Sequence, residues 1–197
     1  AQGSKQKMIL CGNYGAGNLG DEAILKALMK EFGKEYDLTV MSATPSHHPL
    51  KAGFPFRKQT ERSVRSEWAS FRKVPCSIGF LPSGIRSWLR ALFTATGRVA
   101  LKNTKQALEE CDLFVFGGGT LLTDEPWKSL WIWRKQVEGA LKNGKRVWIY
   151  RGGLGPLKRE GSRRWVSNLL KQAERVVLRD PLSMEWATRL GCKSAEL

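Results

Sequence analysis

The chain has 197 residues, 42% of them hydrophobic, and carries a formal net charge of +15. This length suits one domain or a domain with an appendage, and the composition excludes a disordered or fibrous protein. No apolar run approaches the about 20 residues of a membrane-spanning helix, and the first seven residues lack the apolar core of a signal peptide. The positive charge predicts an anionic partner: nucleic acid, an acidic membrane surface or a phosphorylated substrate. Nucleic acid is ranked last, because no helix-turn-helix, zinc-finger or RNP signature accompanies the charge.

The N-terminal part is predicted to alternate strand, helix and strand. The apolar run Met8–Tyr14 predicts a first strand that ends in glycine-rich sequence. A helix is expected over Gly20–Lys34, with Asp21 and Glu22 in its first turn, where negative charge suits the helix dipole. Its core candidates are Ile24, Leu28 and Phe32, on a face that also includes Ala23, Ala27 and Glu31. Leu38–Ser42 is expected to form the second strand.

The stretch from about residue 44 to residue 102 has a different character. It is loop-rich over Thr44–Glu61, basic from Arg57 to Arg90, and helical from Ile85 to Leu108. One face of the expected helix carries Ile85, Trp88, Leu89, Leu92 and Phe93, while Arg86 and Arg90 lie off that face. Two interpretations stay open: a helix that lies in a membrane interface, or an ordinary amphipathic helix packed on the core.

The C-terminal part repeats the alternation. Strands are expected over Asp112–Phe116, Arg146–Tyr150 and Arg175–Leu178, and helices over Leu130–Asn143, Ser162–Ala173 and Pro181–Leu190. Because the strands are continuous apolar runs, the pattern predicts an α/β fold: a Rossmann-like parallel sheet with helices on both faces. This domain is predicted to span residues 8–197. A further strand is expected after Gly191, so we expect a second, C-terminal domain to follow Leu197.

Cysteine, histidine and tryptophan positions give weaker indications. Cys11 and Cys111 lie in or beside apolar segments and are predicted to be buried, and the absence of a CxxC pair favours a reduced, cytoplasmic compartment. The only histidines are two neighbours in a proline-bounded loop, so no metal site is predicted. The cluster Trp127, Trp131 and Trp133 either stacks on sugar rings or packs in the core, and Trp131 is expected in the core.

Three glycine-rich loops follow predicted strands, over Gly12–Gly20, Gly117–Asp124 and Arg151–Pro156. The carboxyl ends of parallel strands form the ligand-binding edge of an open sheet. Glycines there let the backbone approach a ligand and leave N–H groups to bind anions. For a single loop the glycines are as well explained by tight turns, but three such loops together favour a site.

The first loop matches neither a Rossmann GxGxxG in its usual register nor a Walker loop. Asn18, Asp21 and Glu22 are candidates to bind sugar hydroxyls, and the two acids are equally candidates to cap the helix. Arg179 and Asp180 likewise allow two interpretations. They belong to the site, or they form a salt-bridged helix start in which Asp180 precedes Pro181 as N-cap.

Four motifs in order carry a resemblance to a known family. They read GNYGAGNLGDEAIL over residues 12–25, FGGGTLLTD over 116–124, GLGP over 153–156 and LRDPLS over 178–183. Their order and spacing resemble those of the polysaccharide pyruvyl transferases across nearly the whole chain. Two positions depart from that pattern. Arg151 stands where a small or neutral residue is expected, and Glu125 follows Asp124 where relatives tend to have small hydroxyl residues.

The resemblance implies an architecture similar to the two-domain GT-B glycosyltransferases, with this chain as the half that faces the acceptor sugar. It also implies transfer of a pyruvyl unit from phosphoenolpyruvate, as donor substrate, to a saccharide of a cell-surface polysaccharide or a lipid-linked precursor. No cofactor is expected. The candidate catalytic residues are Asp21 and Asp124. The candidate substrate-binding residues are Tyr14, Asn18, Glu22, Gly117, Gly118, Gly119, Arg151, Gly153 and Arg179.

Two other functions stay open on the sequence: half of a nucleotide-sugar glycosyltransferase, and a non-catalytic module that binds saccharide or membrane. The expected partners are a saccharide acceptor and an anionic membrane surface, at the inner face of the plasma membrane. Because much of a phosphoenolpyruvate site would lie in the second domain, this chain alone is expected to be inactive.

Overall fold

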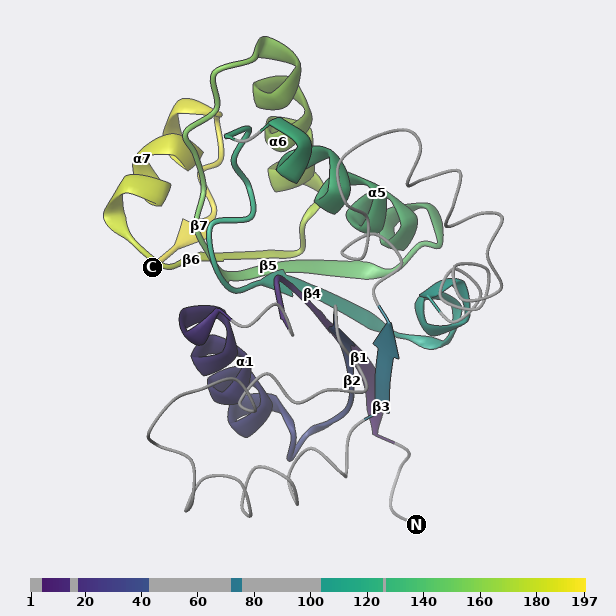
Figure 1. The fold of residues 1–197 in the computed structure, drawn as a ribbon. Helices are drawn as coiled ribbons and strands as arrows, with labels where there is room; N and C mark the ends of the chain where they lie inside the picture. The colour runs from purple at the N-terminus through teal and green to yellow at the C-terminus, as the bar shows by residue number, and fades with distance from the viewer. Residues whose placement is uncertain (1–4, 15–17, 43–71, 76–103, 126) are drawn as a thin grey trace.

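The computed structural model describes residues 5–14, 18–42, 72–75, 104–125 and 127–197, and these form an α/β domain with a seven-stranded sheet. Every neighbouring pair of strands in the sheet is parallel. The strand order is β3-β2-β1-β4-β5-β6-β7. This arrangement confirms the predicted Rossmann-like parallel sheet (Figure 1).

The bounds of the elements follow. The strands are β1 (Gln6–Cys11), β2 (Tyr36–Ser42), β3 (Arg72–Pro75), β4 (Leu113–Gly117), β5 (Arg146–Gly152), β6 (Arg175–Leu178) and β7 (Ala195–Glu196). The helices are α1 (Leu19–Phe32), α5 (Trp127–Lys142), α6 (Glu160–Gln172) and α7 (Pro181–Arg189), and residues 104–110 are also helical.

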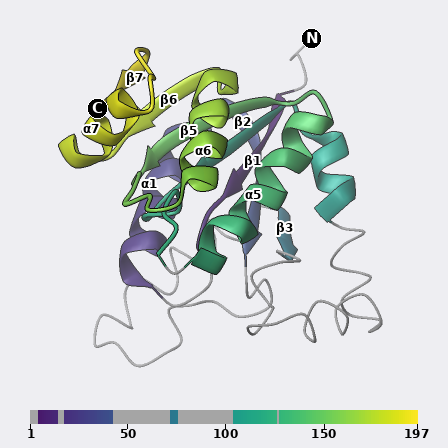
Figure 2. The ribbon, with the colours of Figure 1, turned by 90° about the horizontal axis from the view of Figure 1, so that it is seen from above.

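Helices cover both faces of the sheet because the strands bury apolar side chains on both sides. α1 packs Leu25 and Leu28 against the face that includes Met8 and Leu10 of β1. The opposite face, with Ile9 of β1, is covered by α5, α6 and α7. Viewed from above, α5 and α6 lie over the middle of the sheet (Figure 2).

The strand order reverses direction between β1 and β4. From β1 the chain proceeds outward to β2 and β3, and from β4 it proceeds the opposite way to β5, β6 and β7. The two strands at this switch point are direct neighbours, with Cys11 paired to Phe116. In open α/β sheets, ligands bind outside the carboxyl ends of the strands at such a point.

Three details of the fold differ from the sequence prediction. On α1 the buried side chains are Asp21, Leu25, Leu28, Met29 and Phe32, whereas Ala23 and Ala27 are exposed and Ile24 is only partly buried. The helical stripe is therefore rotated by about one position from the predicted face. Trp131, expected in the core, is 46% exposed, and its neighbour Trp133 is buried instead.

The third difference is β3, a short strand of sequence RKVP that pairs with β2 inside the basic stretch. The strand expected after Gly191 is present as β7, which pairs with β6. Of the expected helix over Ile85–Leu108, residues 104–108 are described and are helical, whereas the rest of it and the two histidines lie outside the described residues.

Within the described part of the chain, no helix is long and apolar enough to cross a membrane. No group of three or more potential metal ligands occurs there either. Cys11 and Cys111 are buried, as predicted, and neither forms a disulfide with another described cysteine.

Candidate functional site

The loops after β1 and β4 meet at the switch point through Tyr14. This side chain is buried, and its hydroxyl donates a hydrogen bond of 2.8 Å to the carbonyl of Gly117. Burial raises the pKa of Tyr14, and the nearby Cys11, Asp21 and Glu22 raise it further. Tyr14 therefore stays protonated, and its hydroxyl group connects the loop after β1 to the end of β4.

The glycines at the end of β4 and in the turn after it are required by close packing and backbone conformation. A Cβ atom on Gly117 would lie 1.9 Å from the backbone carbonyl oxygen of Tyr150. Gly118 and Gly119 have φ angles of 81° and 72°, in the left-handed region that favours glycine. Without side chains, this turn passes directly over Tyr14 and against Asp21.

Asp21 is the carboxylate closest to this turn. It is 4% exposed, its Oδ2 accepts a hydrogen bond of 2.9 Å from Asn13 Nδ2, and its Oδ1 lies 2.4 Å from where a Cβ of Gly119 would stand. Asn18 is the N-cap of α1, and its side chain accepts from the backbone N–H of Gly20 at 3.0 Å. Asn18 therefore performs the capping that the sequence left open for Asp21 and Glu22.

The loop after β5 is attached to the loop after β4 by backbone hydrogen bonds. The N–H of Gly153 donates to the carbonyl of Gly119 at 2.8 Å, and the N–H of Gly155 donates to Leu122 at 2.8 Å. Leu122 and Leu154 also form an isolated parallel bridge. The second and third glycine loops thus form one continuous surface.

Arg151, at the start of the third loop, faces away from that surface. It is the residue at which the pairing of β5 with β6 shifts register, and its φ is 53°. A left-handed φ in a non-glycine residue is strained by about 1–2 kcal/mol. Its guanidinium lies 3.4 Å from Glu31 of α1 and 5.7 Å from the ring of Tyr150. Arg151, which departs from the family pattern, therefore forms a β-bulge, and its side chain contacts Glu31 of α1.

Arg179, directly after β6, is joined to the loop after β4. Its Nη2 donates to Thr120 Oγ1 at 2.7 Å, and its Nε donates to Asp180 Oδ2 at 2.8 Å. Its guanidinium passes over Gly153, where a Cβ would lie 3.0 Å from both Cζ and Nε. Among the described residues no hydrogen bond uses its Nη1, and 40% of the side chain is exposed.

Asp180 is the N-cap of α7, as one of the two interpretations predicted. Its Oδ1 accepts from the backbone N–H of Ser183 at 2.7 Å, and Pro181 occupies the first helical position. Ser183 Oγ in turn accepts from the N–H of Leu154 at 2.9 Å. Burial opposes ionisation of Asp180, but bonds from Arg179 and Ser183 outweigh it and lower the pKa of the carboxyl group.

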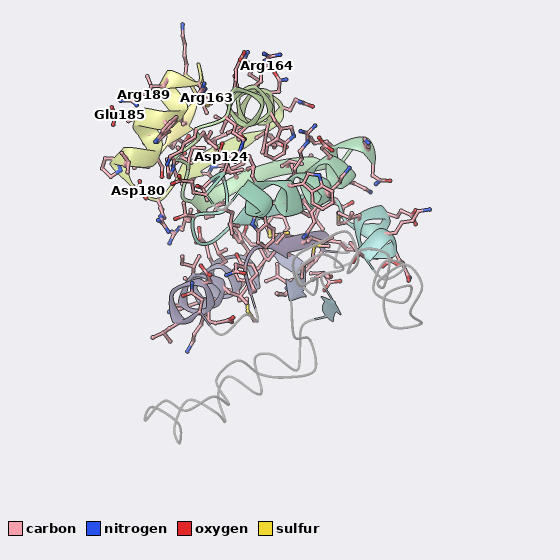
Figure 3. All side chains as sticks on the ribbon, turned by 45° about the horizontal axis from the view of Figure 1, so that its top comes forward. Asp124, Arg163, Arg164, Asp180, Glu185 and Arg189 are labelled. Atoms are coloured by element: carbon pink, nitrogen blue, oxygen red, sulfur yellow. The ribbon has the colours of Figure 1, made fainter. Side chains whose placement is uncertain are left out.

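Asp124 contacts the segment that leads into α6, and Figure 3 labels it together with Arg163 and Arg164 of that helix. It is 2% exposed, and its two oxygens accept from the backbone N–H groups of Lys158 and Arg159 at 2.9 and 2.8 Å. Burial by itself would raise its pKa, but these two bonds and one from Ser162 lower the pKa instead. A general base works best with a pKa near the operating pH, so these contacts favour a structural role, in which Asp124 holds the segment that leads into α6.

The structure therefore links only part of the predicted site. A chain of direct contacts runs from Asp21 through Gly119 and Gly153 to Arg179. The side chains of Asp124 and Arg151 are not part of these contacts: Asp124 accepts from the backbone before α6, and Arg151 pairs with Glu31. Glu22 lies in the first turn of α1, where it is half-buried.

Three polar residues of this network were not among the sequence candidates: Asn13, Thr120 and Ser183. The spacing Asp180-x-x-Ser183 is typical of a helix start and could have identified Ser183. Thr120 and Asn13 carry no comparable signal apart from their place inside glycine motifs.

Comparisons with known proteins show the family of the chain. Residues 18–197 match the family described as "Polysaccharide pyruvyl transferase". No curated protein and no solved structure matches the chain. The matched region contains α1, the loops after β4, β5 and β6, and every hydrogen-bonded contact of Arg179 described above.

Proposed function

The chain belongs to the polysaccharide pyruvyl transferase family, and on that premise we propose that it transfers pyruvate from phosphoenolpyruvate to a saccharide. In this proposal the chain supplies the acceptor-side domain of the enzyme. The acceptor is a cell-surface polysaccharide or its lipid-linked precursor.

The reaction requires two kinds of group. Two sugar hydroxyls add to C2 of phosphoenolpyruvate, the methylene carbon gains a proton to become a methyl group, and the C2–O bond to phosphate breaks. One hydroxyl proton is thereby balanced by the new methyl group and the other by the released inorganic phosphate. The donor's carboxylate and phosphate need cations, and the hydroxyls and the methylene need groups that move protons.

The observation that carries the proposal is Arg179 at the ligand-binding edge. Its guanidinium is fixed on one side by Thr120 and Asp180, while Nη1 is free of protein partners among the described residues. Arginine recognises carboxylate and phosphate through a planar set of donors. Arg179 therefore supplies one cationic contact to the donor, close to the glycine turn that ends at Gly119.

On the acceptor side, Asp21 is the carboxylate that the proposal retains. It lies against Gly119 and keeps one oxygen, Oδ1, on the side of the glycine turn. A carboxylate there would orient a sugar hydroxyl or accept its proton. Asp124 is assigned to the start of α6, because both of its oxygens already accept backbone N–H groups.

Two exposed leucines support a second domain over this edge. Leu19, the first residue of α1, is 61% exposed, and Leu182, in the first turn of α7, is 64% exposed. Both helices begin at the carboxyl edge of the sheet, so the leucines flank the candidate site. We propose that another domain covers them and completes the donor site, and that the 197 residues alone are inactive.

The proposal is tested by measuring phosphate release from phosphoenolpyruvate in the presence of cell-wall saccharide, with the enzyme as the cell makes it. Mass spectrometry of the saccharide should show the gain of one ketal-linked pyruvyl group per phosphate released. Arg179→Ala should lower kcat/KM by at least about 100-fold, since charge-assisted contacts are the strong ones, with an unchanged melting temperature. Phosphate release without any pyruvylated saccharide would contradict the proposal.

We further propose that the protein acts on its acceptor at an anionic membrane surface, the inner face of the plasma membrane. The net charge of +15 supports this, because attraction to anionic lipid contributes about 1 kcal/mol per basic residue near the surface. We expect the protein to pellet with vesicles that contain phosphatidylglycerol and not with phosphatidylcholine vesicles, and to dissociate as salt rises. Equal pelleting with both kinds of vesicle would contradict an electrostatic attachment.

A further inference from the structure

The hydrogen bond between Thr120 and Arg179 has no evident role in the fold. Both side chains are exposed, and they come from loops separated in the sheet by β5. An exposed polar contact of this kind stabilises a protein little. The same contact nevertheless fixes one end of a guanidinium whose Nη1 faces no protein acceptor among the described residues.

Three contacts restrict the guanidinium of Arg179. Thr120 Oγ1 accepts from Nη2 at 2.7 Å, Asp180 Oδ2 accepts from Nε at 2.8 Å, and Gly153 leaves the space over which the group passes. Asp180 is itself fixed by the N–H of Ser183 at the start of α7. The two nitrogens held by protein are Nε and Nη2, so the remaining nitrogen, Nη1, points its two N–H groups in a defined direction.

We propose that Thr120 is a positioning residue that sets the orientation of Arg179 for an anionic group of the donor. This inference rests on the function proposed above. Thr120 acts through Arg179, and Gly153 is required because any side chain there would displace the guanidinium from Thr120. The side chain of Arg179 is thereby ordered before the donor binds, which reduces the entropy lost on binding.

The first test measures the Kd of phosphoenolpyruvate by calorimetry, with inorganic phosphate as a second probe, on the full-length enzyme. Thr120→Val removes the acceptor and keeps the shape of the side chain. We expect it to weaken binding of both anions roughly 10-fold, the scale of one hydrogen bond to a charged group. Thr120→Ser retains the hydroxyl and should bind within about 2-fold of the wild type, a smaller change than loss of that bond causes.

The second test separates orientation from loss of a hydroxyl. Gly153→Ala removes no polar group, but its methyl would lie 3.0 Å from Cζ of Arg179 and 2.9 Å from Thr120 Oγ1. It should therefore weaken anion binding as Thr120→Val does. In an Arg179→Lys background, which lacks the planar set of donors, Thr120→Val should have no further effect.

A matched control is Thr188→Val, at an exposed threonine of α7 whose hydroxyl, among the described residues, bonds only to Met184 of the same helix. It should leave both Kd values unchanged. If the wild type binds phosphoenolpyruvate and Thr120→Val binds it equally well, the positioning role is wrong and the proposed function stands. If the wild type binds neither anion, the proposed function fails and the positioning role fails with it.

Discussion

The two sides of the loop edge are constructed differently. On the β1 side, Tyr14 and Asp21 are buried against Gly117 and Gly119, and their polar atoms are directed at other loop residues. On the side toward β6, Thr120 of the loop after β4 and Arg179 directly after β6 are exposed and bond to each other. The buried side determines the shape of the loops and, in the proposed function, keeps one oxygen of Asp21 at the glycine turn for the acceptor, whereas the exposed side presents positive charge to the donor. Substitutions of Tyr14 or the glycines on the buried side should accordingly lower the melting temperature, and substitutions of Thr120 or Arg179 should raise the Kd of phosphoenolpyruvate.

The largest loss of stability is expected for Gly117→Ala. The added Cβ would lie 1.9 Å from a backbone oxygen of Tyr150, so β4 and β5 must separate locally. Overpacking against fixed backbone costs about 3 kcal/mol or more, and thermal unfolding should begin about 6–12 °C lower. The control is Gly161→Ala in α6, where a Cβ would meet nothing within 4 Å and the melting temperature should stay equal or rise slightly, since alanine favours a helix over glycine. Equal melting temperatures for both variants would contradict the tight packing of the buried side.

Asp124→Asn is expected to have an intermediate effect, on stability rather than on rate. An amide nitrogen would replace one of two oxygens that accept backbone N–H groups, which should cost about 1–3 kcal/mol. Turnover of the full-length enzyme should stay within about 3-fold, whereas loss of a catalytic base costs about 100-fold or more. A large fall in rate without a fall in melting temperature would restore the catalytic interpretation of Asp124.

The same variant has a defined pH dependence. Because folding lowers the pKa of Asp124, its contribution to stability is complete above the unfolded value of about 3.9 and is lost as pH falls through the lower folded value. The difference in melting temperature between wild type and Asp124→Asn should therefore be constant near neutral pH and shrink below about pH 4. A difference that persists in strong acid would show that the ionised carboxylate is not what stabilises the loop.

The smallest effect is expected for Tyr14→Phe. It removes the 2.8 Å bond to Gly117 and leaves the ring in place, so we expect a loss of about 1 kcal/mol. Because the hydroxyl is buried under the loops, the Kd of phosphoenolpyruvate should not change. An increased Kd at constant stability would instead place Tyr14 in contact with the substrate, as the family resemblance implies.

Much of the fold was predictable because β1, β4 and β5 contain apolar runs that are followed by glycines. Leu113–Gly117 is buried at every position, and a strand of that kind can be predicted without knowing which strands pair with it. β3 was not predictable, because the four residues RKVP contain only two apolar side chains and the strand depends on pairing with β2. Trp131 and Trp133 are two residues apart on one helix, and periodicity did not distinguish which of them faces the core.

The candidate site was predictable in location and less so in composition. Glycine motifs placed the loops at one edge, and the contacts between Gly119, Gly153 and Arg179 follow from that placement. The role of Asp124 depends on two backbone N–H groups more than 30 residues later in the chain. Such a partner is set by tertiary structure and leaves no local pattern. Thr120 escaped prediction for the same reason, since its partner follows a different strand.

The bridge between Leu122 and Leu154 extends the β4–β5 pairing beyond the end of both strands. Together with the bonds from Gly153 to Gly119 and from Gly155 to Leu122, it makes the two loops a small ladder of their own. In hydrogen-exchange terms, the amides of Gly153 and Gly155 should open in one step with those around Leu122, as a single cooperative unit. A ligand bound to either loop would then slow exchange in both, and its binding energy would be shared across residues that it never touches.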